Sequence, residues 1–174
     1  MSEENTVRLE LLGETHRGAL EALIEDPDVL RFTRVPSPPP EGFAESWIDR
    51  YEQHRLDGTR EGFAIVDPDD GSFLGLAVAA RIDRTEQTVE LGYIVAPAAR
   101  GRGIATEALR QLTEWAFSEV DALRIELMIS PGNVASKAVA RRCGYVKEGV
   151  LRSSYFKQGL REDTEIWSRL PGDP

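Results

Sequence analysis

The stretch Arg100-Gly101-Arg102-Gly103-Ile104-Ala105-Thr106 places two glycines and two arginines between a predicted strand and a predicted helix. Glycine readily adopts positive φ and lets a ligand approach the backbone closely. The first N–H groups of a helix have no partner within the helix, and they lie at the positive end of its dipole. Arginine adds a permanent positive charge with forked donors. The stretch therefore predicts a site for a phosphate or pyrophosphate group.

Three sequence patterns are candidates for this stretch. A P-loop needs Gly-Lys followed by Ser or Thr, and no such triplet follows these glycines. A dinucleotide-binding loop needs a third glycine where Thr106 stands, together with repeated parallel strand-helix-strand units that the sequence lacks. The pattern Arg/Gln-x-x-Gly-x-Gly/Ala matches Arg100, Gly103 and Ala105 in register. An ordinary glycine-rich loop that opens a helix is the alternative to a functional site.

A second segment follows the strand after this helix. It reads NVASKAVARRCGY from Asn133 to Tyr145, with Ser136 three residues after the asparagine. Together the two segments resemble the GNAT superfamily of N-acetyltransferases, and in particular its RimJ/RimL-like subgroup of ribosomal-protein acetyltransferases. The stretch Glu90-Leu91-Gly92-Tyr93 resembles the fourth strand of that subgroup, and residues 159–163 resemble its last hairpin. The resemblance covers nearly the whole chain and is strongest over residues 89–145.

The resemblance implies acetyl-CoA as the acyl donor. In the superfamily the fourth and fifth strands splay apart after a bulge, and the free backbone of the fourth strand pairs with the pantetheine arm. A backbone N–H of that strand then polarises the thioester carbonyl. By this resemblance the cofactor-binding residues are Tyr93, Ile94, Val95, Arg100, Gly101, Arg102, Gly103, Ile104, Ala105, Thr106, Asn133 and Ser136.

The implied fold is α+β, a mixed sandwich whose central, mostly antiparallel twisted sheet has about seven strands with helices on both faces. Hydrophobic periodicity predicts a matching order of elements. Predicted strands cover residues 6–12, 62–66, 73–82, 88–95, 123–129, 145–151 and 162–170. Predicted helices cover residues 15–24, 41–56, 103–120 and 133–143, the first of them capped by Thr15. The proline-rich residues 35–40 are expected to form a loop between helices.

Acyl transfer to an amine requires the neutral amine, and Glu90 is the candidate general base, acting through water. A strand glutamate that faces solvent or an arginine is the alternative. The resemblance gives Ser136 the role of proton donor to the sulfur, whereas a serine in a first helical turn can also cap backbone N–H groups. Two residues differ from the pattern of the superfamily, so the mechanism of those members cannot be assigned directly to this chain. Ala140 stands where many members carry an acid tyrosine, and Met128 stands where some carry a base glutamate.

Composition limits the class of protein. The 174 residues suit one domain spanning 1–174, and a net charge of −9 argues against binding to nucleic acid. With one cysteine and two distant histidines, no metal site is expected. No apolar run is long enough for a membrane helix and no secretory start is present, so a cytoplasmic protein is expected.

The sequence thus predicts an acetyl-CoA-dependent N-acetyltransferase. It would act on a protein N-terminal α-amine or a small-molecule amine by direct attack in a ternary complex, as a monomer or homodimer. The alternative is an acyl-CoA-binding or sensing protein of weak activity on the same fold.

Overall fold

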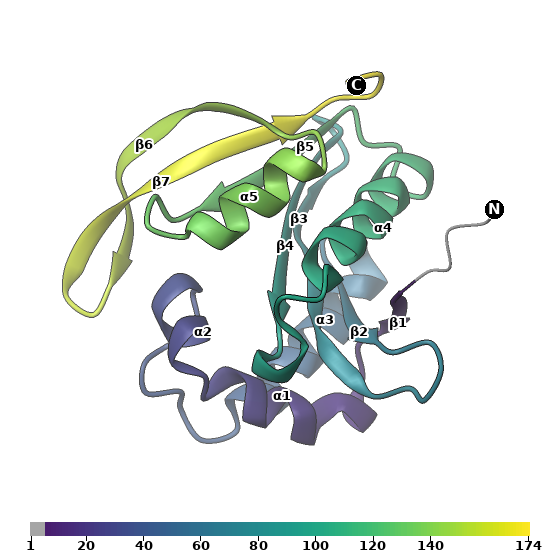
Figure 1. The fold of residues 1–174 in the computed structure, drawn as a ribbon, viewed down its shortest axis with the longest axis vertical. Helices are drawn as coiled ribbons and strands as arrows, with labels where there is room; N and C mark the ends of the chain where they lie inside the picture. The colour runs from purple at the N-terminus through teal and green to yellow at the C-terminus, as the bar shows by residue number, and fades with distance from the viewer. Residues whose placement is uncertain (1–5) are drawn as a thin grey trace.

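The computed structural model describes residues 6–174, which form a seven-stranded sheet in the order β1-β2-β3-β4-β5-β7-β6 (Figure 1). Every neighbouring pair is antiparallel except β4 and β5, which are parallel. The strands are β1 (Arg8–Leu11), β2 (Glu61–Val66), β3 (Phe73–Asp83), β4 (Thr88–Val95), β5 (Arg124–Ile129), β6 (Val146–Lys157) and β7 (Leu160–Arg169). The helices are α1 (Arg17–Ile24), α2 (Pro27–Phe32), α3 (Phe43–Asp57), α4 (Ile104–Ser118) and α5 (Val134–Arg142), with short 3-10 turns at Glu14–His16 and Pro97–Ala99.

Helices cover both faces of the sheet (Figure 1). On one face, α4 and α5 pack against alternate residues of the central strands, such as Ile125 and Leu127 of β5. On the other face, α1, α2 and α3 enclose a second apolar cluster that meets the sheet at Leu76 of β3. Since successive side chains of a strand point to opposite faces, β3 and β4 contribute to both clusters. The predicted α+β sandwich is confirmed.

Two details of the first hundred residues differ from the sequence prediction. Thr15 does not cap the first helix, because Gly13 begins a 3-10 turn in which its N–H donates to Nδ1 of His16 at 3.2 Å, and α1 starts only at Arg17. The sequence prediction also missed α2. Its signals are present, because the side chain of Asp26 accepts from the N–H of Val29 at 3.1 Å and a proline occupies the first turn.

The parallel contact between β4 and β5 is short. It runs from Thr88 opposite Arg124 to Leu91 opposite Leu127 and then stops. At the same level β3 contains an extra residue, Ala80. The residues on either side of it, Ala79 and Arg81, pair with Leu91 and Glu90, which are adjacent in β4. A bulge bends a strand and increases its twist. Beyond Leu91 no residue of β4 pairs with β5, which confirms the predicted splay.

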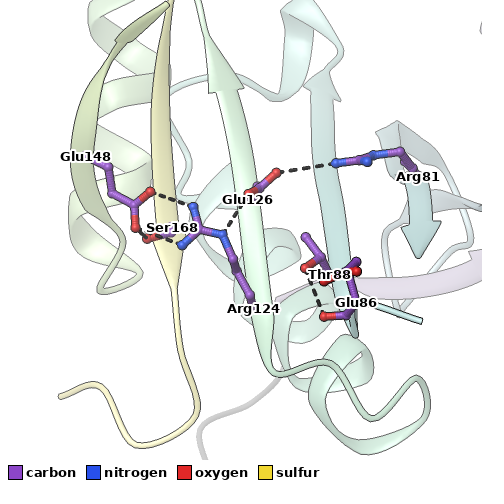
Figure 2. Close-up of polar contacts among 7 residues, drawn as sticks. All are labelled: Arg81, Glu86, Thr88, Arg124, Glu126, Glu148 and Ser168. Carbon is purple, nitrogen blue, oxygen red and sulfur yellow. Dashed lines mark hydrogen bonds and ion pairs between the residues drawn. The ribbon is translucent and has the colours of Figure 1, made fainter. Parts of the chain in front are cut away.

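A charged network crosses the sheet face opposite α4 and α5 (Figure 2). The guanidinium of Arg124 in β5 donates to Glu126 at 2.7 Å and to both carboxylate oxygens of Glu148 in β6, at 2.8 and 2.5 Å. Ser168 of β7 donates to Glu148 at 2.6 Å, and Arg81 of β3 lies 3.6 Å from Glu126. The network links four strands of the sheet. Hydrogen bonds from Arg124 and then Ser168 lower the pKa of Glu148 from its ordinary 4.5 to about 2.

We expect this network to contribute stability in a pH-dependent way. Because the pKa of Glu148 is lower in the folded state, its contribution is fully present above pH 4.5 and is lost as the pH falls toward 2. Glu148→Gln should lower the free energy of unfolding by no more than about 1 kcal/mol at pH 7, since the pair is partly exposed and screened by solvent. Urea titrations at pH 7 and pH 3 measure the difference. Glu86→Gln is the control, and an equal loss at both pH values for Glu148→Gln would contradict the prediction.

Candidate active site

Two pockets meet at the splay. A pocket of about 480 Å³, the α5 pocket, lies between β4, the glycine-rich loop, α2 and α5. A second pocket of about 310 Å³, the α3 pocket, lies on the other side of β4, against α3 and the β6–β7 hairpin. The residues that line both pockets are Phe32, Thr33, Tyr93, Ile94, Asn133 and Ser136. A ligand in one pocket can therefore reach a ligand in the other through the gap beside β4.

The glycine-rich loop borders the α5 pocket. Gly101 has φ 75° and Gly103, the residue that caps α4, has φ 80°. A Cβ atom at either position would meet no atom within 4 Å, so the backbone angle rather than crowding requires glycine. Within residues 6–174, the N–H groups of residues 103–105 donate to no hydrogen-bond acceptor. These N–H groups at the start of α4 suit an anion.

Arg100 has partners that the sequence did not reveal. Its guanidinium donates to Asp26 at 2.6 Å and to Asp28 at 3.1 Å, both at the start of α2, and its Nε donates to the Val95 carbonyl at 3.2 Å. Although partial burial opposes the change, the Arg100 hydrogen bond and the Val29 N–H lower the pKa of Asp26. Arg100 therefore joins α2 to the loop with its charge already balanced, and a contact between Arg100 and a phosphate stays a prediction.

Three other arginines differ in their relation to the α5 pocket. Arg102 lines neither pocket. Arg141 lies over the ring of Trp167 at 5.2 Å. Arg142 lines the α5 pocket, and no carboxylate of residues 6–174 pairs with it. Of the arginine pair at the end of α5, Arg142 is therefore the one whose charge is available to a ligand.

The register of β4 decides which backbone groups face the gap. The N–H of Ala96 donates to the Leu74 carbonyl at 2.8 Å. In an antiparallel pair the groups of alternate residues point to the same neighbour, so Ile94 also pairs with β3. The N–H and C=O groups of Tyr93 and Val95 then point into the gap that β5 has left. Ile94 lines both pockets, but its backbone N–H and C=O groups pair with β3.

Asn133, Ser136 and Tyr93 form the junction of the two pockets. The Asn133 side-chain oxygen accepts from the Ser136 N–H at 3.0 Å, so Asn133 rather than Ser136 caps α5. The Ser136 hydroxyl instead lies 2.8 Å from the phenol oxygen of Tyr93. The capping alternative for Ser136 is therefore wrong. Burial raises the pKa of Tyr93 to about 12, so its phenol stays protonated at neutral pH. The sequence had predicted only a backbone role for Tyr93.

Glu90 lines the α3 pocket and is half-buried. Its cross-strand neighbour is Arg81, but the Arg81 guanidinium lies near Glu126 on the next strand instead. No ion pair or side-chain hydrogen bond joins Glu90 to another of residues 6–174, so its pairing with an arginine, one of the two alternatives, does not occur. Met128 lines the same pocket, whereas Ala140, a residue of α5, is fully buried. The position of the usual acid tyrosine is thus part of the core.

The β6–β7 hairpin fixes the end of α2. The Tyr155 hydroxyl donates to the Thr33 carbonyl at 2.6 Å, and the Lys157 ammonium donates to the carbonyls of Leu30 and Thr33. An ammonium at the last carbonyls of a helix is favourable. Tyr155 also lines the α3 pocket, while Phe156 is exposed. These contacts join residues more than a hundred positions apart, and no local signal in the sequence predicts them.

Comparisons with known proteins agree with this geometry. The family described as Acetyltransferase (GNAT) domain matches residues 6–146. The chain is 34% identical over 101 residues to the protein named "Putative ribosomal N-acetyltransferase YdaF" of Bacillus subtilis (strain 168), an alignment that covers 58% of this chain and only 55% of that relative.

Two solved structures share the fold. One is RimL, a ribosomal L7/L12 α-N-protein acetyltransferase in complex with coenzyme A, with a TM-score of 0.87 and 20% identity over 96% of this chain and 95% of that one. The other is a spermidine N-acetyltransferase of Vibrio cholerae in complex with CoA and spermine, with a TM-score of 0.84 and 20% identity over 97% of both chains.

The chain therefore belongs to the GNAT family of acetyl-CoA-dependent N-acetyltransferases, and the similarity to YdaF supports its RimJ/RimL-like subgroup. Within residues 6–174, no helix has the length and apolar character that crossing a bilayer requires. The same residues contain no group of three or more His, Cys, Asp or Glu side chains placed to hold a metal ion.

We expect Arg142 to contribute to the binding of coenzyme A. Arg142→Gln should raise the Kd about two- to fivefold, because one partly exposed charge contact contributes up to about 1 kcal/mol. Isothermal titration calorimetry with coenzyme A measures the change, which should shrink as the salt concentration rises. Arg141→Gln is the matched control on the adjacent residue. Equal Kd values for the Arg142→Gln variant and the unmodified protein would remove Arg142 from the site.

Proposed function

We propose that the chain transfers an acetyl group from acetyl-CoA to a primary amine, either a protein N-terminal α-amine or a small-molecule amine, by direct attack in a ternary complex. The observation that carries this proposal is the pair of pockets that meet at Tyr93, Asn133 and Ser136. Two substrates that must react with each other need separate pockets with a shared boundary. The expectations of one domain over residues 1–174, a cytoplasmic location and a monomer or homodimer remain predictions.

The residues around the α5 pocket fit acetyl-CoA, which supplies an acetyl group activated as a thioester. The N–H groups of residues 103–105 would hold the pyrophosphate at the start of α4. The N–H and C=O groups of Tyr93 and the N–H of Val95 suit the amides of the pantetheine arm, since they face the gap as the groups of a neighbouring strand would. The Val95 carbonyl already accepts from Nε of Arg100. The side-chain amide of Asn133 keeps its N–H donors available, because only its oxygen caps the helix.

The acceptor amine must lose a proton before or during attack. At pH 7 about one α-amine in ten is neutral, whereas fewer than about one lysine amine in a thousand is. Glu90 lies in the α3 pocket and pairs with no cation of residues 6–174, so its carboxylate is available to accept that proton through a water molecule. An α-amine needs less help from such a base, and this favours it over a lysine side chain as the acceptor.

Ser136 and Tyr93 are suited to stabilise the departing thiolate. An ordinary thiol has a pKa of about 8.5, so full proton transfer from a phenol with a pKa of about 12 would cost about 5 kcal/mol. A hydrogen bond without transfer avoids that cost. We therefore give the Ser136 hydroxyl the role of hydrogen-bond donor to the sulfur, with Tyr93 orienting it from 2.8 Å. This pair offers an alternative to the acid tyrosine that Ala140 replaces.

A second candidate function is the binding or sensing of acyl-CoA with little turnover. Ala140 and Met128 favour it, because the side chains that serve as acid and base in relatives of the superfamily are missing. Release of free thiol from acetyl-CoA with a panel of amines separates the two functions. Binding of acetyl-CoA with no amine-dependent release above background would exclude the transferase.

We expect Ser136→Ala to lower kcat by about ten- to a hundredfold, because a hydrogen bond to a charged group contributes about 1.5–3 kcal/mol. Tyr93→Phe should lower kcat by less, about fivefold, since it keeps the serine and removes only its partner. Steady-state kinetics should give nearly unchanged KM values for acetyl-CoA. A rise in KM with constant kcat would instead assign the pair to cofactor binding.

We expect Glu90→Gln to lower kcat/KM about a hundredfold near pH 7, the lower end of the range for a general base. The loss should narrow as the pH rises, because more of the acceptor is then neutral without assistance. Profiles of kcat/KM from pH 6 to 10 test this, with Glu86→Gln as the control. Parallel profiles for Glu90→Gln and the unmodified protein would remove Glu90 from the mechanism.

A further inference from the structure

The α3 pocket is lined by an excess of positive charge. Three arginines line it, Arg34, Arg50 and Arg60, against the two carboxylates Glu90 and Asp163. The chain as a whole has 30 acidic and 21 basic residues. The side chains that line the α3 pocket therefore carry a net positive charge, whereas the protein as a whole is negative.

These three guanidinium groups have no counter-ion among residues 6–174. Arginines elsewhere do, as in the pairs of Arg55 with Glu61 at 2.8 Å and Arg124 with Glu148 at 2.5 Å. None of the ion pairs or side-chain hydrogen bonds within residues 6–174 includes Arg34, Arg50 or Arg60. The charge in the pocket is therefore available to a ligand.

The carboxylates do not neutralise the arginines. Asp163 accepts a hydrogen bond from the Ser153 N–H at 2.9 Å, at the exposed part of the β6–β7 hairpin. Glu90 is the candidate base beside the junction of the pockets. The Arg34 guanidinium lies 5.5 Å from the centre of the Tyr155 ring, on the hairpin side of the pocket.

The sheet register separates Arg60 from Glu90. Arg60 precedes β2, whose first residue, Glu61, pairs with Ala79, which in turn pairs with Leu91. Arg60 and Glu90 thus stand at the same level, two strand spacings or about 10 Å apart in the backbone. An acceptor amine near Glu90 would therefore place a group a few bonds away near Arg60.

Tyr51 of α3 lines the same pocket as these charges. Its ring contacts the position of Gly62 in β2, where an added Cβ would come within 3.0 Å. Burial is the main cause that raises the pKa of Tyr51; the positive charges of Arg60 and Arg50 oppose the rise, and the negative charge of Glu90 adds to it. The three charged groups therefore lie near enough to the Tyr51 phenol to act on it, and all of them line this pocket.

We propose that the acceptor is a primary amine that also carries an anionic group, a carboxylate or a phosphate, which Arg50 and Arg60 bind while the amine lies near Glu90. This inference rests on the proposed function. A polyamine is disfavoured, since its second cation would lie beside guanidinium groups that have no counter-ion among the described residues 6–174. Arg34 adds to the same preference from the hairpin side.

Acceptor peptides that differ in one charge test the proposal. The peptides are Ala-Glu-Ala-amide, Ala-Gln-Ala-amide and Ala-Lys-Ala-amide, compared with spermidine by thiol release from acetyl-CoA. We expect kcat/KM to be at least about tenfold higher for the Glu peptide than for the Gln peptide, because a charged hydrogen bond has that effect. Spermidine and the Lys peptide should rank lowest. Free glutamate and O-phosphoethanolamine distinguish a small carboxylate or phosphate acceptor from a peptide.

Variants of Arg50 and Arg60 test whether these residues cause the preference for the Glu peptide over the Gln peptide. The double variant Arg50→Gln/Arg60→Gln should reduce the ratio of kcat/KM between the Glu and Gln peptides to about one. Arg152→Gln is the matched control, because Arg152 is exposed on β6 and lines neither pocket. Equal or faster acetylation of the Gln peptide or of spermidine by the unmodified protein would overturn the proposal, as would a ratio that persists in the double variant.

A binding measurement keeps this inference separate from the proposed function. If no amine releases thiol above background, the transferase activity fails. Calorimetry in the presence of coenzyme A then compares N-acetyl-Ala-Glu-Ala-amide with N-acetyl-Ala-Gln-Ala-amide. Tighter binding of the Glu peptide that is lost in Arg50→Gln/Arg60→Gln supports the anion site, and equal binding of the two peptides overturns it.

Discussion

The end of pairing between β4 and β5 after Leu91 and Leu127 is the constraint on which the site depends. One extra residue in β3, Ala80, lies at that level, and such a bulge bends its strand and increases the local twist. The gap leaves backbone groups of Tyr93 and Val95 without a strand partner. The pockets on the two sides of β4 adjoin each other at this gap and share Tyr93, Asn133 and Ser136 in their lining.

Competition between ion pairs decides which charges remain available to ligands. Arg100 is held by two aspartates and orders α2 against the glycine-rich loop. Arg81 lies near Glu126, and no cation among residues 6–174 pairs with Glu90. Arg142, Arg50 and Arg60 lie beside the two pockets and pair with no carboxylate in the same part of the chain. The chain is acidic overall, so these unbalanced positive charges mark where it can bind anions.

The sequence predicted the elements whose hydrophobic residues repeat at regular spacing or whose ends are marked by glycine or proline. The bounds of β4 and the end of α3 at Gly58 follow from such signals, and the glycines of the loop have the positive φ that their position implied. The short helix α2 was missed because six residues give no periodic pattern, although Asp26 and Pro27 mark its start. The hydrogen bond between Ser136 and Tyr93 was missed because it joins residues 43 positions apart.

The family and the glycine conformation at the start of α4 follow from the sequence alone, because they depend on motifs in fixed order and on local backbone geometry. Only the tertiary structure decided the state of each charged side chain. Arg100 and Arg142 are both arginines beside the same pocket, yet one is neutralised by α2 and the other is free. That difference depends on which distant carboxylates lie within a few ångströms, and local sequence patterns do not encode such distances.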